Sequence, residues 1–285
     1  MKKLVLLAGM ILAMLKNEAQ IASVSDSLNG QAPAEPLLPN ARPAAEPVYR
    51  LKPAVDIPLT AVAAGWSGFA FTKIYNKDRS TPAEIMALDK NDLASYNRHG
   101  ADVYYPKAAD ASDILFYGSM PLPLLLLADK EIRKDAGKVG FLYLEAMSIT
   151  GLLYTGSVYF VDKYRPYVYN PETPMDKRLG GGGKNSFFAG HVALVGTSTF
   201  FMAKVLSDYH PESRAKWAFF SAAGLATGAT AYLRYRAGQH FLDDLIIGTA
   251  VGTLSGILVP HLHKNKSPRS TGLSLSPVLG RQQGL

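Results

Sequence analysis

Long apolar segments alternate with polar connections over most of the chain. The apolar segments cover residues 54–72, 111–128, 139–161, 189–206, 217–233 and 243–262. Each is much longer than the roughly four to eight residues of a buried strand, so their lengths predict helices. We therefore expect an all-α protein built as a single bundle of about six main helices, with polar connections at 73–110 and 162–188.

The N-terminus has the layout of an export signal. Lys2 and Lys3 precede an apolar run from Leu4 to Leu15, which is short for a membrane span, and a polar stretch rich in small residues follows. We predict a signal peptide over residues 1–22, with an uncleaved membrane anchor as the alternative. The chain contains no cysteine, which is compatible with an oxidising compartment and leaves no thiolate for catalysis or metal binding.

Polar segments separate the predicted helical domain from both ends of the chain. Residues 23–53 contain six prolines among Ala and Glu, a composition that opposes helix and favours an extended linker with little packed structure. The helical domain is then expected over residues 54–262, followed by a polar tail over 263–285.

Hydropathy and charge leave two environments open. Glu145, Lys204 and Asp243 interrupt the apolar segments, and the mean hydropathy is only +0.03, so a soluble bundle and membrane-spanning helices both fit. The net charge is +7, but the basic residues are interspersed with acidic ones and form no aromatic-basic pattern. This excludes nucleic acid as an expected partner and suits an anionic small molecule or a membrane surface.

Two short stretches combine charge with a helix boundary. Arg165 and Pro166 follow the third apolar segment, where proline ends a helix and basic residues favour its last turn. Gly190 and His191 begin the fourth segment. A helix N-terminus offers unpaired N–H groups to an anion, glycine lets the anion approach the backbone, and histidine can donate a proton. Each stretch also has a purely structural interpretation.

A third stretch contains the most charged and titratable side chains. Arg234 and Arg236 precede His240, and Asp244 follows His240 by four residues. On one helix His240 and Asp244 would share a face, so the carboxylate would hold one ring nitrogen and leave the other free for nucleophilic attack. Two histidines and a carboxylate (His191, His240 and Asp244) can also bind iron or zinc. The neighbouring arginines favour an anion instead, so we predict no metal and no cofactor.

In this order and with these separations, the three stretches resemble the signature motifs of the type 2 phosphatidic acid phosphatase (PAP2) and vanadium haloperoxidase superfamily. Those motifs are Lys, six residues and Arg-Pro; Pro-Ser-Gly-His; and Ser-Arg, five residues, His, three residues and Asp. The resemblance covers about 160–250 directly, and the helices from 54 to 262 fit the PAP2-like domain. The third motif matches best, since Arg234, His240 and Asp244 stand at the family's spacing.

The resemblance implies a metal-independent phosphatase. His240 would attack phosphorus to form a phosphohistidine, Asp244 would orient His240, and His191 would protonate the leaving oxygen. The groups implied to hold the phosphate are Arg165, Arg234 and the backbone N–H of Gly190. A dianion whose charge redistributes during reaction needs several fixed donors of this kind.

The chain departs from the motifs at several positions. Val158 stands where the family has lysine, Phe188 and Ala189 replace Pro and Ser, and Leu233 replaces the Ser before the arginine. The changes at Val158 and Ala189 remove two phosphate donors. The nearby cations that could replace them are Lys163, Lys184 and Arg236.

The predicted substrate is a lipid phosphate, such as phosphatidate or a polyprenyl diphosphate. The alternatives are a soluble periplasmic acid phosphatase and a weakened or non-catalytic anion-binding envelope protein. A vanadate-dependent oxidase would need the missing lysine, and we predict no protein partner.

We expect a bacterial-type cell envelope location, in the inner membrane or periplasm, with the site facing the periplasm. The first, third and fifth connections of an up-down bundle lie at one end, so Arg165, His191 and His240 can converge there. If the signal peptide is cleaved and all six segments span, that end faces the cytoplasm. A periplasmic site therefore requires a soluble bundle, or a segment 54–72 that lies flat on the membrane.

Overall fold

Six long helical segments correspond to the six apolar stretches. The computed structural model describes residues 47–265. Its long helices are α2 (Pro53–Ile74), α5 (Lys107–Ser119) with the 3-10 helix η3 (Leu122–Ala128), α7 (Ala136–Phe160), α10 (Gly190–Tyr209), α11 (Ala215–Arg236) and α12 (Leu242–His263). Within the described range strand-like pairing is limited to two isolated bridges, so the all-α prediction is confirmed. The predicted signal peptide, most of the linker and most of the tail lie outside the described residues.

Short helices occupy the connections, so the expected number of about six applies to the long helices only. They are α3 (Pro82–Met86), η1 (Lys90–Asp92), α4 (Ser95–Arg98), η2 (His99–Asp102), α6 (Lys130–Lys134), α8 (Pro166–Tyr169), α9 (Met175–Leu179) and η4 (Gly181–Lys184).

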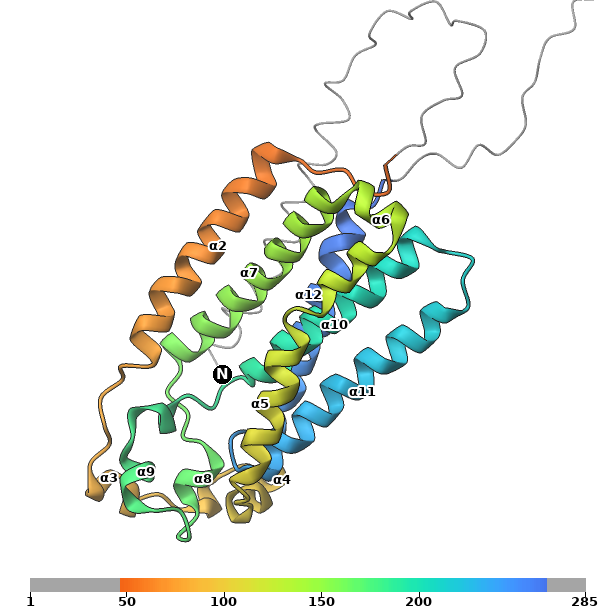
Figure 1. Cartoon of the computed structure of the whole chain (residues 1–285). Helices are drawn as coiled ribbons and strands as arrows, with labels where there is room; N and C mark the ends of the chain where they lie inside the picture. The colour runs from red at the N-terminus through yellow and green to blue at the C-terminus, as the bar shows by residue number, and fades with distance from the viewer. Residues whose placement is uncertain (1–46, 266–285) are drawn as a thin grey trace, which may run out of the picture.

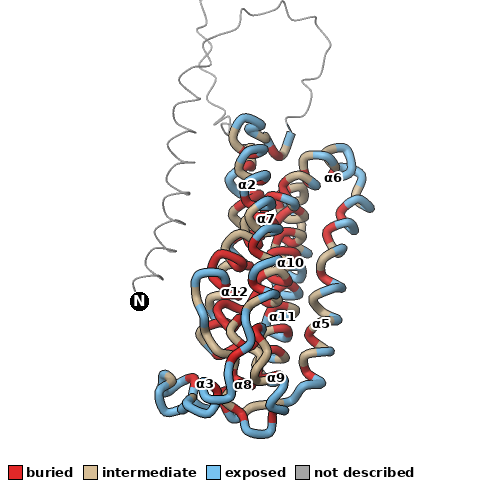
Figure 2. Tube along the Cα trace, turned by 90° about the vertical axis from the view of Figure 1, so that its left-hand side faces the viewer, coloured by how far each residue is buried: buried red, intermediate tan, exposed pale blue. Residues whose placement is uncertain are grey.

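Successive long helices run in opposite directions along the bundle (Figure 1). The connections after α2, α7 and α11 consequently gather at one end, the lower end in Figure 1. The start of α2 and the end of α12 lie at the other end. The buried positions concentrate in the middle of the bundle, along α7, α10 and α12 (Figure 2). The alternating helix direction expected from the sequence is therefore found. It brings the segments that carry the three motifs to one end of the bundle.

Small residues let α10 and α12 pack closely. A Cβ added at Gly248, Gly252 or Gly256 of α12 would lie 2.6, 2.2 or 2.6 Å from a backbone oxygen of α10. The three glycines repeat every four residues, so they share one face of α12. This contact places the first turns of α10 and α12, which carry His191 and Asp244, side by side.

The last part of the predicted linker is packed, contrary to expectation. Backbone hydrogen bonds join residues 48–50 to residues 263–265 at the end of α12. The Tyr49 side chain is fully buried, and its hydroxyl donates to Asp208 at 2.9 Å. The folded unit therefore extends beyond 54–262 at both ends, because the buried tyrosine hydroxyl finds its partner inside the bundle.

Three helical segments of the described chain are long and apolar enough to cross a membrane. They are Pro53–Ile74, Lys107–Ala128 and Leu242–His263. Their exposed large apolar side chains include Ile57, Val62, Phe69, Ile114, Leu124, Leu125, Ile246 and Leu254. Because α2 packs along α7 as a member of the bundle, the alternative in which residues 54–72 lie flat does not fit the fold.

The α10–α12 contact yields a stability prediction. Gly252→Ala should destabilise the protein by about 1–3 kcal/mol, since the new methyl group overlaps the α10 backbone. Gly224→Ala in α11 is the matched control. A Cβ there meets nothing within 4 Å, and alanine favours helix by roughly 0.5–1 kcal/mol. Thermal unfolding of both variants checks this, and equal melting temperatures would contradict tight packing at Gly252.

Candidate active site

The predicted site residues lie together at the end of the bundle where the connections meet. Arg165 caps the start of α8, Gly190 and His191 begin α10, Arg234 lies in the last turn of α11, His240 lies between α11 and α12, and Asp244 lies in the first turn of α12. Arg234, His240 and Asp244 are buried. Segments about 80 residues apart thus supply one site, as the motif comparison predicted.

Arg165 and Arg234 converge on a single oxygen atom. Nη1 of Arg165 donates a short hydrogen bond to Oε1 of Gln239, and Nη2 of Arg234 donates to the same oxygen at 3.4 Å. Two guanidinium groups around one acceptor form the kind of donor set that binds a phosphate oxygen. Nothing in the sequence distinguished Gln239 except that it precedes His240.

The glycine run 180–183 holds Arg165 through backbone carbonyl groups. The carbonyl of Gly183 accepts from the Arg165 backbone N–H at 2.8 Å, and the carbonyl of Gly182 accepts from its Nε at 3.1 Å. At Gly181 an added Cβ would lie 1.9 Å from the carbonyl oxygen of Lys77. The run therefore holds the arginine through its backbone, in a space that larger residues would not fit.

His191 lies beside the arginine pair and contacts an aspartate. Its Nε2 is 3.1 Å from Oδ1 of Asp113, and the same oxygen accepts from Nη1 of Arg234 at 3.3 Å. Burial, together with the positive charges of Arg234 and Arg165, lowers the pKa of His191 to about 3. The ring is therefore neutral at pH 7, with Nε2 close to the carboxylate of Asp113, a residue of α5 that no sequence signal marked.

His240 presents one ring nitrogen to the site and uses the other to hold its position. Nδ1 donates to the carbonyl of Ser186 at 2.7 Å, which leaves the lone pair on Nε2. Burial is the main cause that lowers the pKa of His240 well below its usual value, and Arg165 and Arg234 add to it. His240 is therefore neutral at pH 7, the form that a nucleophile requires.

Asp244 supports His240 differently from the prediction. α12 begins at Leu242, so His240 precedes the helix and the two residues do not share a helical face. Ser186 links them instead, because its carbonyl accepts from His240 and its hydroxyl donates to Oδ2 of Asp244 at 2.6 Å. That carboxylate oxygen also accepts from the backbone N–H of Phe241 at 3.0 Å, so Asp244 fixes the loop that carries the histidine.

The three cations expected to replace the missing donors have other partners. Lys163 donates to Asp244 at 2.7 Å and to Asp243 at 2.8 Å, where it balances two carboxylates. Lys184 donates to the carbonyl of Asp78 at 3.4 Å, and Arg236 donates to the hydroxyl of Tyr232 at 3.1 Å. The replacement hypothesis therefore gains no support from these contacts.

The two positions that lack a family donor are both fully buried. Val158 packs in an apolar cluster with Ile74, Tyr154 and Phe188, and only its carbonyl meets a cation, Nζ of Lys77 at 2.7 Å. Ala189 is the N-cap of α10 and makes no side-chain capping bond; it packs against Val192 and Leu245. Hydrophobic packing thus occupies both positions.

Two glycines shape the backbone around the histidines. A Cβ at Gly190 would lie 2.6 Å from the Tyr154 ring, so only glycine allows the start of α10 to approach α7 this closely. Gly238 has a φ of 66°, a left-handed conformation that favours glycine. The turn that it makes after α11 directs Gln239 and His240 into the site.

A family model matches the part of the chain that carries Arg165, His191 and His240. Residues 139–268 match the model described as the PAP2 superfamily, a range that includes α7, α10, α11 and α12. No curated protein and no solved structure matches the chain significantly.

The position of Asp113 yields a binding prediction. Its carboxylate lies between Arg234 and His191, the groups that would meet an anion, so it repels that anion. Asp113→Asn should therefore lower the inhibition constant of inorganic phosphate, by about tenfold for a change of ~1.4 kcal/mol. Asp110→Asn, three residues earlier on α5, is the control. An increase in the inhibition constant on Asp113→Asn would mean that the carboxylate positions His191 for binding instead.

Proposed function

Over residues 139–268 the chain belongs to the PAP2 superfamily, and from this we propose that it is a metal-independent phosphatase of lipid phosphates that works through a phosphohistidine. Membership of the superfamily supports phosphoric ester hydrolysis in general. The lipid substrate, the intermediate and the residue roles are our proposal.

One observation carries the proposal. Arg165 and Arg234 donate to the same oxygen atom, Oε1 of Gln239, which is the residue before the neutral His240. Both guanidinium groups contact Oε1 of Gln239, and both influence the pKa of His240. A phosphoryl group in place of the amide oxygen would meet two fixed cations while its phosphorus faces Nε2 of His240. Such preorganised donors stabilise the charge that develops during phosphoryl transfer.

The reaction would take two steps. In the first, the Nε2 lone pair of His240 attacks phosphorus, the P–O bond to the leaving group breaks, and His191 gives its proton to the departing oxygen. In the second, His191 takes a proton from water, the water oxygen attacks phosphorus, and the P–N bond breaks to release phosphate. The Ser186 carbonyl accepts from Nδ1 throughout and stabilises the positive charge that the ring acquires.

Substrate binding would charge His191. In the free site the pKa of His191 is about 3. At pH 7 the ring is therefore neutral and is a poor proton donor. Burial is the largest cause of this low pKa, and the charges of Arg234 and Arg165 add to it. A phosphate dianion between the two arginines would offset their charges and so raise the pKa of His191. His191 would thus become a proton donor only in the complex.

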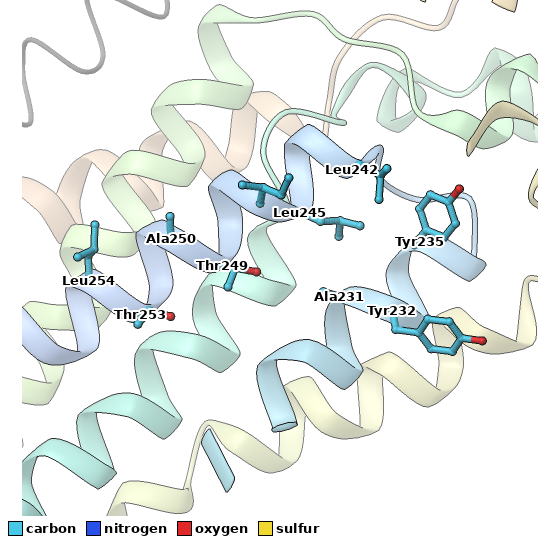
Figure 3. A pocket seen from close by; sticks show the side chains of 10 residues that line it. Ala231, Tyr232, Tyr235, Leu242, Leu245, Thr249, Ala250, Thr253 and Leu254 are labelled. Atoms are coloured by element: carbon cyan, nitrogen blue, oxygen red, sulfur yellow. The ribbon is translucent and has the colours of Figure 1, made fainter. Parts of the chain in front are cut away.

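An apolar groove lined from Leu242 onwards, two residues after His240, supports a lipid substrate. It has a volume of about 680 Å³ and lies between α11 and α12 (Figure 3). Leu242 and Leu245 line it from the first turn of α12, next to Asp244, and Tyr235 lines it from the end of α11. An acyl or prenyl chain in this groove would have its phosphate end near His240, and its burial would contribute about 0.8 kcal/mol per methylene group.

Apolar surfaces on three helical segments support membrane association. Three segments have the length and composition of membrane spans, and large apolar side chains cover their outer faces. We propose that a signal peptide over residues 1–22 exports the chain to a bacterial-type envelope, where the bundle attaches to the membrane from the periplasmic side without crossing it, so that the site faces the periplasm. Orientation rests on the expected export signal and on the family resemblance.

The second candidate is a weakened, anion-binding relative. Val158 and Ala189 are its specific support, since both are buried among apolar groups and remove a charge and a hydroxyl. Loss of one preorganised donor lowers catalytic rates by ~10² to 10³. The protein would then bind phosphate without hydrolysing it at a useful rate.

Turnover measurements separate the two candidates. The full chain in detergent with EDTA should hydrolyse a chromogenic phosphate ester and dioleoyl phosphatidate. His240→Ala should lower kcat by at least ~10³, because it removes the nucleophile. His210→Ala, a partly exposed histidine paired with Asp129 at the far end, should keep full activity. Equal background rates for wild type and His240→Ala, with phosphate binding retained, would favour the anion-binding relative.

A groove variant tests the lipid part of the proposal. Thr249→Trp fills the groove, so it should lower kcat/KM for dioleoyl phosphatidate relative to the chromogenic ester by about tenfold, through lost burial of the acyl chain. Leu225→Trp, at an exposed position of α11 outside the groove lining, is the control for a bulky surface residue. An unchanged ratio of the two substrates would remove the groove from the binding site.

A further inference from the structure

A buried cluster of two carboxylates and one imidazole lies at the end of the bundle opposite the phosphate site. Asp56 comes from the first turn of α2, Glu145 from α7, and His263 is the last residue of α12. Their exposed fractions are 2, 1 and 7%, and one ligand atom from each lies within 4.8 Å of the others. The cluster is separated from Asp244 by most of α12, roughly 28 Å at 1.5 Å per residue.

His263 is held in the tautomer that a metal ligand needs. Its Nδ1 donates to the carbonyl of Val259 at 2.8 Å, so Nε2 is the nitrogen that faces the two carboxylates. A ligating histidine in proteins usually donates its other N–H to a backbone carbonyl or a carboxylate in this way. Asp56 is oriented as well, because Oδ2 accepts from the backbone N–H of Lys52 at 2.5 Å.

The distances within the cluster fit ligands around a metal ion. Nε2 of His263 is 3.3 Å from Oδ2 of Asp56 and 3.7 Å from Oε2 of Glu145. A charge-assisted hydrogen bond measures roughly 2.7–2.9 Å. Ligands at roughly 2.0–2.2 Å from a tetrahedral zinc ion lie roughly 3.3–3.6 Å apart, close to the two observed separations.

A divalent cation would suit the charges of this group. Two carboxylates and a neutral imidazole carry a charge of −2, which a divalent ion offsets, and buried carboxylates in proteins are paired or coordinate metals.

We propose that Asp56, Glu145 and His263 bind a divalent transition-metal ion, with zinc as the best-suited ion. One imidazole and two carboxylates form a donor set that zinc accepts. The ion joins the start of α2, the middle of α7 and the end of α12, so its role is structural. It lies outside the phosphate site, and the proposed metal-independent reaction does not involve it.

Zinc titration of the metal-free protein tests this site. The tag-free full chain, stripped with EDTA and dialysed, should bind one zinc ion per chain with a rise in Tm of several degrees, because the ion binds only the folded state. His263→Gln and, independently, Asp56→Asn should weaken zinc binding at least tenfold and remove the rise. Zinc-edge X-ray absorption should show one imidazole among oxygen ligands, and His263→Gln should lose it.

Two control variants test whether the zinc ion binds at another histidine. His210→Gln, at the histidine 2.8 Å from Asp129, and His240→Ala in the phosphate site should both keep the full rise in Tm. Failure of the wild type to bind zinc would show that the cluster is a protonated ion pair and overturn the proposal. Wild-type zinc affinity in folded His263→Gln or Asp56→Asn protein would overturn it too. If one variant does not fold, the other and the absorption spectrum decide.

Discussion

The close contact between α10 and α12 is the constraint on which the site depends. Gly248, Gly252 and Gly256 bring the α12 backbone against the backbone of α10, and this contact aligns the first turns of the two helices. His191 begins one of these helices, and the loop that carries His240 leads into the other. A larger residue at Gly252 would separate the helices, and with them His191 and His240.

Burial then determines the protonation states of the site. His240 is neutral mainly because it is fully buried, and His191 mainly because it is largely buried; two nearby arginines add to both effects. The same arginines need an anionic partner, which Asp113 supplies in part. In the proposed reaction, an entering dianion would complete this charge balance.

Charged groups gather at both ends of the bundle. The end with Arg165 and Arg234 also carries Asp113, Asp243 and Asp244, and the opposite end pairs Asp208 with Lys204 and Lys264. The helices between them are apolar on most faces, so charged groups cluster where connections bring several segments together.

The long helices, their alternating direction and the grouping of the three motifs were predictable from the sequence alone. Helix length follows from the run of apolar residues, and in an up-down bundle parity places Arg165, His191 and His240 at one end. The supporting contacts were not predictable. Gln239, Asp113 and Ser186 belong to different connections or helices, and side-chain packing across distant segments decides which polar atoms meet. The i, i+4 relation predicted for His240 and Asp244 was wrong for a related reason: the loop stays non-helical through Phe241, held by Gly238 and by the capping bond to Asp244. The sequence thus determined the fold and the types of residue at the site, whereas tertiary structure decided which atoms hold each histidine, because hydrogen bonds depend on positions that no local pattern encodes.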